Sequence, residues 1–335
     1  MKVLFIGGTG NISTPVSKMV IDKGIDLYIL NRGTRKVTIE GAKSLIADIN
    51  KEDECKKVLE GHQWDVVVNW VAFTANDVER DFRLFNGITN QYIFISSASA
   101  YQKPLSNPVV TESTPLKNPY WDYSRDKIAC EDKLNTLYRD SDFPVTIVRP
   151  SLTYDTVIPV AIGSWDDYTI IDRMKKGKKV IVHGDGSSLW TITHAEDFAK
   201  GIIGLFGHQQ AIGNSFHITS DEILTWDQIY EAVAEAAGVK ANIIHIPSDF
   251  ICHVADKLGQ EWMRGNLHGD KAVSVIFDNS KIKSFVPTFK ATIPFCVGIK
   301  RTVKWFEEKP ERMTVIEESN KFIDTIIEEY EKAFK

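Results

Sequence analysis

The chain has 335 residues, 43% hydrophobic and 25% charged, a composition typical of one large or two smaller globular domains. Its 45 Asp and Glu residues outnumber 40 Lys and Arg residues, and the net charge of −5 argues against a general nucleic-acid or membrane-surface binder. The sequence has no apolar stretch of about 18 residues, so we expect no membrane-spanning segment.

The first half of the chain alternates short apolar runs with helical patterns. We predict strands over residues 3–6, 25–30, 44–47, 65–68, 92–95 and 145–148, and helices over 11–23, 51–59, 77–85 and 122–139. The strands are continuously apolar, so both of their faces should be buried. This order predicts an α/β fold with a doubly wound parallel sheet, in which ligands bind beyond the carboxyl ends of the strands.

The regular alternation of predicted strands and helices ends after Pro150. We expect an irregular segment over 151–176, a strand over 180–182, a further candidate strand over 216–218 and a mostly helical tail from Pro310. Two capping boxes, Thr193 with Glu196 and Thr225 with Gln228, each predict the start of a helix. We therefore predict two interleaved domains: residues 1–158 and about 179–220 bind a nucleotide cofactor, and about 159–178 and 221–335 bind substrate.

A glycine-rich turn follows the first strand and consists of Gly7, Gly8, Thr9, Gly10, Asn11 and Ile12. Glycines permit a tight turn and let the backbone approach a pyrophosphate at the start of the next helix. Ser13 stands where the usual spacing has a third glycine. Two interpretations remain open: the turn binds a cofactor, or it is an ordinary tight turn.

The second strand ends at Asn31 and Arg32, with Arg35 and Lys36 close by. An acidic residue at this place would bind the ribose hydroxyls of NAD, whereas arginine can pair with the 2′-phosphate of NADP. The sequence therefore favours NADP over NAD. The alternative is a solvated turn with ordinary surface charges.

Tyr123 and Lys127 are four positions apart on the predicted helix over 122–139, so they share one face. A tyrosine with a pKa near 10 is a poor base at neutral pH, but a neighbouring ammonium group stabilises the phenolate. Ser97, just after the fifth strand, could hydrogen-bond a substrate oxygen. Ordinary pairing on a surface helix is the alternative interpretation.

Taken together, these motifs resemble the extended short-chain dehydrogenase/reductase superfamily, in its NAD-dependent epimerase/dehydratase group. The resemblance covers most of residues 1–218 and rests on Gly7-Gly8-Thr9-Gly10, Asp48, the 96–101 segment Ser-Ser-Ala-Ser-Ala-Tyr, Tyr123 with Lys127, Arg149-Pro150, Gly184-Asp185-Gly186 and the helix around Asp197. It implies a Rossmann domain, a smaller C-terminal substrate domain and a catalytic set of Ser97, Tyr123 and Lys127. It also implies that Asp48 and Ile49 border the adenine. Val71 and Ala72, after the fourth strand, are further expected cofactor contacts.

The chain departs from the family pattern at three places. The family's catalytic asparagine before the fifth strand has no clear counterpart over 77–85, Trp190 replaces a diphosphate-binding arginine, and Tyr154-Asp155-Thr156 replaces Tyr-Gly-Pro. The start of the chain also resembles an atypical branch that includes isoflavone reductase-like proteins, sugar dehydratases and chloroplast stem-loop RNA-binding proteins.

Several other residues have two interpretations. The lysines of 175–179 could bind phosphate or RNA, although a solvated turn is favoured.

Aromatic residues could line a ring-binding pocket or pack in the core: Trp121, Trp165, Tyr168 and Trp190. The substrate candidates are Ser99, Tyr154, Trp165 and Trp190. His183, His194 and His268 lack a metal-ligand spacing, so no metal is expected.

The four cysteines are spread along the chain: Cys55, Cys130, Cys252 and Cys296. Their spacing predicts neither a zinc site nor a redox pair, and free thiols in a cytoplasmic protein are expected. The first apolar run reaches Gly7 too soon for a signal peptide.

The predicted function is NAD(P)-dependent hydride transfer at a secondary alcohol or ketone carbon of a sugar-like or other small carbonyl substrate. The alternative is a nucleic-acid-binding or cofactor-sensing protein on the same fold. The charged residues over 77–85 predict a monomer or a weak homodimer, because an obligate interface would need an apolar face.

Overall fold

The computed structural model describes residues 1–34 and 37–333, and its centre is a sheet of seven parallel strands in the order β12-β7-β5-β4-β1-β2-β3. These strands are β1 (Lys2–Ile6), β2 (Asp26–Asn31), β3 (Lys43–Ile46), β4 (Val66–Asn69), β5 (Tyr92–Ile95), β7 (Val145–Pro150) and β12 (Ser215–Ile218). The strand order reverses at β1 and β4, and this reversal opens a crevice at their carboxyl ends. The predicted doubly wound parallel sheet is confirmed, including the candidate strand over 216–218.

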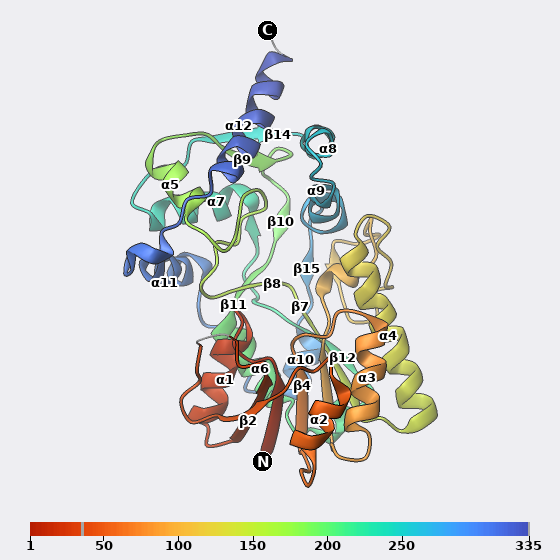
Figure 1. Cartoon of the computed structure of the whole chain (residues 1–335). Helices are drawn as coiled ribbons and strands as arrows, with labels where there is room; N and C mark the ends of the chain where they lie inside the picture. The colour runs from red at the N-terminus through yellow and green to blue at the C-terminus, as the bar shows by residue number, and fades with distance from the viewer. Residues whose placement is uncertain (35–36, 334–335) are drawn as a thin grey trace.

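Helices cover both faces of the sheet (Figure 1). They are α1 (Ser13–Asp22), α6 (Ala195–Gly204) and α10 (Ser280–Phe285) on one face, and α2 (Glu52–Leu59), α3 (Ala75–Phe85) and α4 (Asp122–Ser141) on the other. Strand β1 shows why two apolar layers form. Val3 and Phe5 pack with α1 and α6, whereas Leu4 and Ile6 pack with α2 and α3, because side chains alternate across a strand.

A second hydrophobic core lies beyond the carboxyl ends of the strands, in the upper part of Figure 1. Its elements are α5 (Thr169–Lys175), β9 (Val180–His183), α7 (Trp226–Ala236), β14 (Ile243–Ile246), α8 (Ser248–Lys257), α9 (Trp262–Asn266), the π-helical segment η3 (Leu267–Lys271), α11 (Phe295–Glu307) and α12 (Glu317–Lys332). Short strands and 3₁₀ turns complete the chain: β6 (Val109–Val110), β8 (Leu152–Tyr154), β10 (Leu189–Trp190), β11 (Ile192–His194), β13 (Leu224–Thr225), β15 (Ile276–Phe277), η1 (Ala98–Ala100), η2 (Gln209–Ala211) and η4 (Pro310–Arg312).

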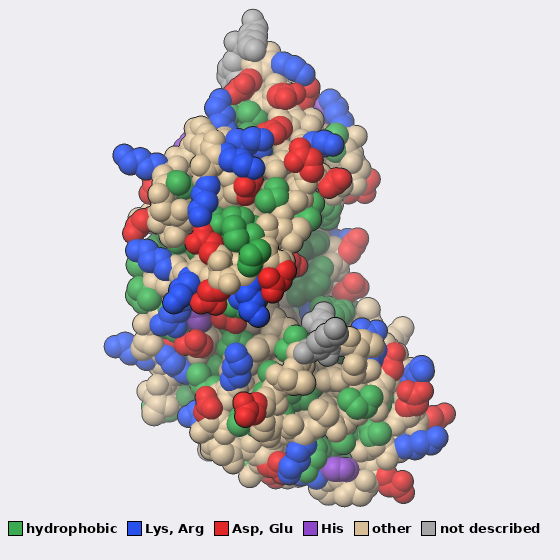
Figure 2. All heavy atoms as spheres, turned by 60° about the vertical axis from the view of Figure 1, so that its left-hand side comes forward, with side chains coloured by type: hydrophobic (Ala, Val, Ile, Leu, Met, Phe, Trp, Pro, Cys, Tyr) green, Lys and Arg blue, Asp and Glu red, His purple; other side chains and the backbone are tan. Residues whose placement is uncertain are grey.

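The chain passes between the two cores more than once. Strand β9 pairs with β14 and packs in the second core, although the domain boundaries predicted from sequence assign it to the first domain. The division into domains stays a prediction. On the face in Figure 2, the molecule is hollowed between its lower and upper parts, and acidic and basic side chains are interspersed.

Two sequence predictions after Pro150 were wrong. The 151–176 segment is not wholly irregular, since it contains β8 and α5. Strand β8 pairs with β11, forty residues later in sequence, and α5 buries Ile170, Ile171 and Met174 in the second core. Tertiary contacts of this kind leave little local pattern.

The first predicted capping box was also wrong. Helix α6 begins one residue later than expected, because His194 caps it by accepting a hydrogen bond from the Glu196 amide at 3.2 Å. Thr193 instead accepts one from the Ser220 amide at 2.9 Å. The second capping box is confirmed, with both hydrogen bonds between Thr225 and Gln228 present.

Candidate active site

The turn after β1 follows the backbone path that its glycines permit. Gly7 and Gly8 have φ values of +92° and +102°, a region that residues with a side chain rarely adopt. A Cβ at Gly7 would also lie only 3.1 Å from Cγ1 of Val71. The Ser17 hydroxyl donates to the Gly8 carbonyl at 2.9 Å and holds the turn against α1. The first turn of α1 contains no acidic residue, so its positive dipole end is available to an anion.

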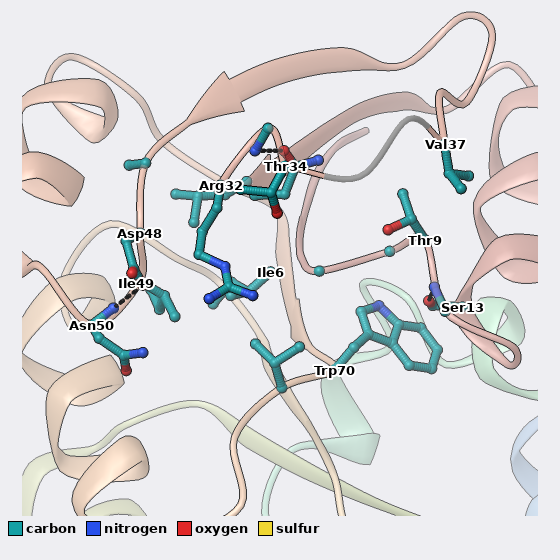
Figure 3. Close-up of a pocket in the computed structure, with 18 of the residues that line it drawn as sticks. Ile6, Thr9, Ser13, Arg32, Thr34, Val37, Asp48, Ile49, Asn50 and Trp70 are labelled. Carbon is teal, nitrogen blue, oxygen red and sulfur yellow. Dashed lines mark hydrogen bonds between the residues drawn. The ribbon is translucent and has the colours of Figure 1, made fainter.

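This turn forms one wall of a cavity of about 480 Å³, which we name the glycine-turn cavity (Figure 3). Nine residues expected to bind the cofactor line it: Gly7, Gly8, Thr9, Gly10, Asn31, Arg32, Asp48, Ile49 and Val71. They come from the ends of β1, β2, β3 and β4, so the crevice at the strand reversal brings together residues that lie up to 64 positions apart, from Gly7 to Val71.

The end of β2 places a cation in the glycine-turn cavity. Arg32 is exposed, and its guanidinium group extends into the cavity toward Ile6 (Figure 3). None of the ion pairs within residues 1–34 and 37–333 involves Arg32. Asn31 Oδ1 accepts a hydrogen bond from the Gly33 amide at 2.9 Å and shapes the turn. Arg35 and Lys36, which the sequence placed nearby, lie outside the described residues.

A second cavity of about 450 Å³, which we name the Tyr–Lys cavity, shares Gly10, Ser13, Trp70 and Phe73 with the glycine-turn cavity. Its lining includes the predicted residues Asn11, Ile12, Ser97, Ser99, Tyr123, Lys127 and Trp165. The two cavities are therefore neighbours with a common wall. A ligand that extended from the glycine turn could reach Tyr123.

Lys127 is fixed by the sheet. Its Nζ donates to the carbonyl oxygens of Ala72 at 2.7 Å and Ile95 at 2.9 Å, and it lies 5.9 Å from the centre of the Tyr123 ring. Burial lowers the pKa of Lys127 to about 8. Ala72, an expected cofactor contact, lines neither cavity, and its place in the site is to hold this ammonium group.

Hydroxyl groups form a chain beside Tyr123. Ser97 and Tyr123 line the same cavity, and Ser97 Oγ lies 2.9 Å from Ser99 Oγ. Ser124 donates to Ser99 Oγ at 2.8 Å. Burial raises the pKa of Tyr123, and the nearby Ser97 hydroxyl acts in the opposite direction. The hydroxyls of Ser97 and Ser99 and the phenol of Tyr123 therefore all belong to the lining of the Tyr–Lys cavity.

Asn11 has a structural contact that its place in a glycine turn does not predict. Its amide nitrogen donates to the Thr153 carbonyl at 3.1 Å, and its Oδ1 accepts from the amides of Asp155 and Thr156 at 3.0 and 3.2 Å. Asn11 and Ile12 line the Tyr–Lys cavity rather than the glycine-turn cavity. This side chain links the turn to the segment after β8.

Two predicted substrate contacts, Tyr154 and Trp190, are corrected by the structure. Tyr154 is fully buried and packs edge-on against His194 and Phe295. Trp190 is also buried and packs against Trp226. Neither residue lines either cavity, so the core-packing interpretation holds for both. Tyr168, another aromatic residue weighed above, is likewise buried.

Among the lining residues that sequence reasoning missed are Trp70, Phe73, Asp270 and Lys271. Trp70 and Phe73 follow β4, and their place after a strand could have identified them. Asp270 and Lys271 come from η3, a π-helical segment with no side-chain period that would have pointed to them. Among residues 1–34 and 37–333, no group of three or more His, Cys, Asp or Glu side chains is placed to hold a metal ion.

The lysines of 175–179 are paired with carboxylates. Lys176 lies 2.8 Å from Asp172 and Lys178 lies 3.8 Å from Asp324, while Lys175 and Lys179 pair with Glu307 and Glu331. These pairs support the interpretation of the segment as an ordinary charged surface turn. In the part of the chain that the structure describes, no helix is long and apolar enough to cross a membrane.

Residues 3–219 match the model of the NAD dependent epimerase/dehydratase family. A chloroplast stem-loop binding protein of 41 kDa from Arabidopsis thaliana is 24% identical over 267 residues, which are 74% of this chain and about two thirds (67%) of the plant protein. The fold is similar to that of epimerase Mth375 from Methanothermobacter thermautotrophicus, with a TM-score of 0.75, 16% identity and 93% coverage of each chain. It is also similar to a dTDP-glucose 4,6-dehydratase from Bacillus anthracis in complex with NAD, with a TM-score of 0.72, 18% identity and coverage of 93% and 98%.

Proposed function

Because the chain belongs to the NAD-dependent epimerase/dehydratase family and is an enzyme of that family, we propose that it oxidises or reduces a secondary alcohol or ketone carbon of a small, sugar-like substrate. The observation that supports this proposal most is the position of Ser97, Tyr123 and Lys127. All three line the Tyr–Lys cavity, which shares a wall with the glycine-turn cavity.

The residues of the glycine-turn cavity fit a dinucleotide. The backbone of the turn would approach the pyrophosphate, because Gly7, Gly8 and Gly10 carry no side chain and the positive φ values of Gly7 and Gly8 are ones that glycine readily adopts. Asp48 and Ile49 would border the adenine. When bound, a nicotinamide cofactor supplies the group that accepts or donates hydride at the reacting carbon.

The chain's own residues handle the proton. In the oxidative direction Tyr123 takes the proton of the substrate hydroxyl, and in the reductive direction it returns the proton to the oxygen. Lys127 favours the phenolate by its charge, and Ser97 orients the substrate oxygen through its hydroxyl. Burial raises the pKa of Tyr123 and lowers that of Lys127, so it disfavours the charged form of each side chain. The phenolate and the ammonium group are therefore favoured only when their opposite charges lie close together.

We also propose that NADP(H) is bound more tightly than NAD(H). Asn31 brings no negative charge to the end of β2, and Arg32 already extends into the glycine-turn cavity. A 2′-phosphate carries up to two negative charges and can pair with this guanidinium group. Asp48 lines the same cavity and limits the gain.

The first experiment asks whether the purified protein holds a cofactor. Native mass spectrometry identifies any NAD(H) or NADP(H) that co-purifies, and fluorescence of reduced nicotinamide then follows turnover with metabolite fractions. Tight retention favours epimerase or dehydratase chemistry, in which hydride returns to the same substrate, and loss on dilution favours a simple reductase. A protein that binds neither cofactor at millimolar concentration would contradict the proposed function.

A second candidate function is nucleic-acid binding or cofactor sensing on the same fold, and the plant relative's name is the observation that favours it. The net charge of −5 and the paired lysines of 175–179 oppose it. Filter retention of RNA at increasing salt distinguishes the two functions, because phosphate contacts weaken steeply with salt. We expect no salt-sensitive retention at moderate ionic strength.

A further inference from the structure

The π-helical segment η3 forms part of the wall of the Tyr–Lys cavity. It contributes Asp270 and Lys271 to the lining, opposite residues of the first half of the chain. Its backbone is anchored in the second core, because the Lys271 carbonyl accepts hydrogen bonds from His183 Nε2 at 3.0 Å and Trp226 Nε1 at 3.1 Å. π-helical turns are rare and occur frequently at functional sites.

Besides Trp70, two indole rings line the same cavity, those of Trp121 and Trp165. Trp121 is seated directly on the helical backbone, because a Cβ at Gly265 would clash with its ring and one at Gly269 would lie 3.0 Å from its Cβ. The Trp121 and Tyr123 ring centres are 5.0 Å apart, so this indole lies beside the proposed proton acceptor. Trp165 is fixed by a 2.8 Å hydrogen bond from its Nε1 to the Val160 carbonyl. Rings held in this way offer a rigid apolar surface to a ligand.

The cations of the cavity are already engaged. Among the described lining residues these cations are Lys127 and Lys271, and arginine is absent. Lys127 donates to two backbone carbonyls. Lys271 Nζ donates to Asn266 Oδ1 at 2.7 Å and Asp270 Oδ2 at 3.0 Å, and its side chain is only 3% exposed.

This charge balance disfavours a nucleoside diphosphate. Such a ligand would bring at least two negative charges next to the Asp270 carboxylate, with no free cation in the lining to pair with them. Lys103 does not line the cavity. It is buried, which lowers its pKa, and the nearby charges of Asp270 and Lys271 respectively raise and lower that pKa. Asp270 and Tyr123 line the same cavity, and after burial the negative charge of Asp270 also raises the pKa of Tyr123.

A neutral ring with several hydroxyl groups matches what the cavity offers. The Asp270 carboxylate can accept hydrogen bonds from substrate hydroxyls, and the hydroxyls of Ser97 and Ser99 can donate. The apolar face of such a ring can pack on an indole, as in small-molecule sites with few polar groups on an aromatic wall. We propose that the Tyr–Lys cavity selects a neutral, polyhydroxylated ring without phosphate, with Asp270 as the specificity-determining acceptor. This inference rests on the proposed function for its substrate site.

The test titrates the full chain, with and without saturating cofactor, with two sets of probes. UDP and UDP-glucose represent nucleoside diphosphates, and D-glucose, D-galactose, D-mannose and myo-inositol represent neutral rings. Quenching of tryptophan fluorescence reports binding, since Trp121 and Trp165 line the cavity. Asp270→Asn is compared with Asp256→Asn, which changes an exposed carboxylate on α8 that pairs with Arg264.

We expect saturable binding of at least one neutral probe, weakened roughly tenfold or more by Asp270→Asn and unchanged by Asp256→Asn. Tighter binding of UDP or UDP-glucose than of every neutral probe would overturn the inference and leave hydride chemistry intact. Absence of saturable binding by all neutral probes would also overturn it. Failure to bind NAD(P), by contrast, would overturn the proposed function and is measured separately.

Discussion

Lys127 is the residue on which the electrostatics of the Tyr–Lys cavity depend. Only 3% of the residue is exposed, and the carbonyl oxygens of Ile95, at the end of β5, and Ala72, in the loop after β4, solvate its ammonium group in place of water. Those carbonyls offset only part of the cost of burial, so the pKa of Lys127 falls to about 8. A lysine with a pKa this close to neutrality can respond to a charge that arrives in the site.

The lowered pKa of Lys127 makes stability depend on pH. Below pH 8 both folded and unfolded chains bind the proton, and the folded state bears the full cost of burying the charge. Between pH 8 and the ordinary lysine pKa of 10.5 the unfolded chain binds more protons, so stability rises with pH. Relative to Lys127→Met, the wild type should gain on the order of 2–3 kcal/mol across this window. Urea unfolding at both ends of the window measures it, and a difference that is constant with pH would disprove this view of Lys127.

Arg32 gives a prediction about cofactor choice. A charge-assisted hydrogen bond to a 2′-phosphate is worth roughly 1.5–3 kcal/mol, and an exposed site gives the low end, or about tenfold in affinity. Arg32→Ala should remove most of the preference for NADP(H) and leave NAD(H) affinity nearly unchanged. Calorimetric titration of both cofactors measures this, with Arg139→Ala on α4 as the control. Equal affinity of the wild type for both cofactors would show that the end of β2 has been misinterpreted.

Among the elements, the glycine turn has a backbone conformation that other residues adopt only with strain, and the same turn is expected to contact the cofactor. Gly7→Ala would force a side chain into φ +92° and against Val71, whereas Gly24→Ala meets a similar φ of +70° with no atom within 4 Å. Each change should cost about 1–2 kcal/mol of stability through backbone strain. Only Gly7→Ala should also weaken cofactor binding, by tenfold or more. Equal cofactor affinity in both variants, measured by calorimetry, would contradict the assignment of the turn to the cofactor.

The elements that sequence predicted well are those with a strong local signal. Continuous apolar runs located the first six strands of the sheet to within one or two residues. The candidate strand over 216–218 corresponds to the seventh, β12. Helix α1 begins at Ser13 rather than at residue 11, because Gly10 donates to the Ser13 hydroxyl and extends the turn. The η3 segment carries no period of its own, so Asp270 and Lys271 could be placed only by the fold. Tyr154 and Trp190 were misplaced because an aromatic residue has the same sequence signal in a core and in a pocket.

For the whole molecule, we expect any self-association to depend on the outer surface of α3 and α4. These helices pack against each other and are joined by an ion pair between Lys133 and Glu79. The exposed side of α4 is polar, with Arg125, Asp126 and Asp132 among its residues. A stable dimer buries a more apolar surface than this. We predict a monomer or a weak dimer, and sedimentation at nanomolar concentration that shows a tight dimer would refute this.

In the proposed mechanism Tyr123 exchanges the proton with the substrate oxygen. The most direct measurement is the rate of nicotinamide reduction, by rapid mixing with a substrate that the wild type turns over, in Tyr123→Phe and in Tyr120→Phe. Tyr120 is exposed and lines neither cavity, so it is a matched control. Loss of a general base should slow Tyr123→Phe by about 10²–10⁴-fold with cofactor affinity unchanged, while Tyr120→Phe keeps the wild-type rate. A Tyr123→Phe protein that reduced its cofactor at the full rate would contradict the account.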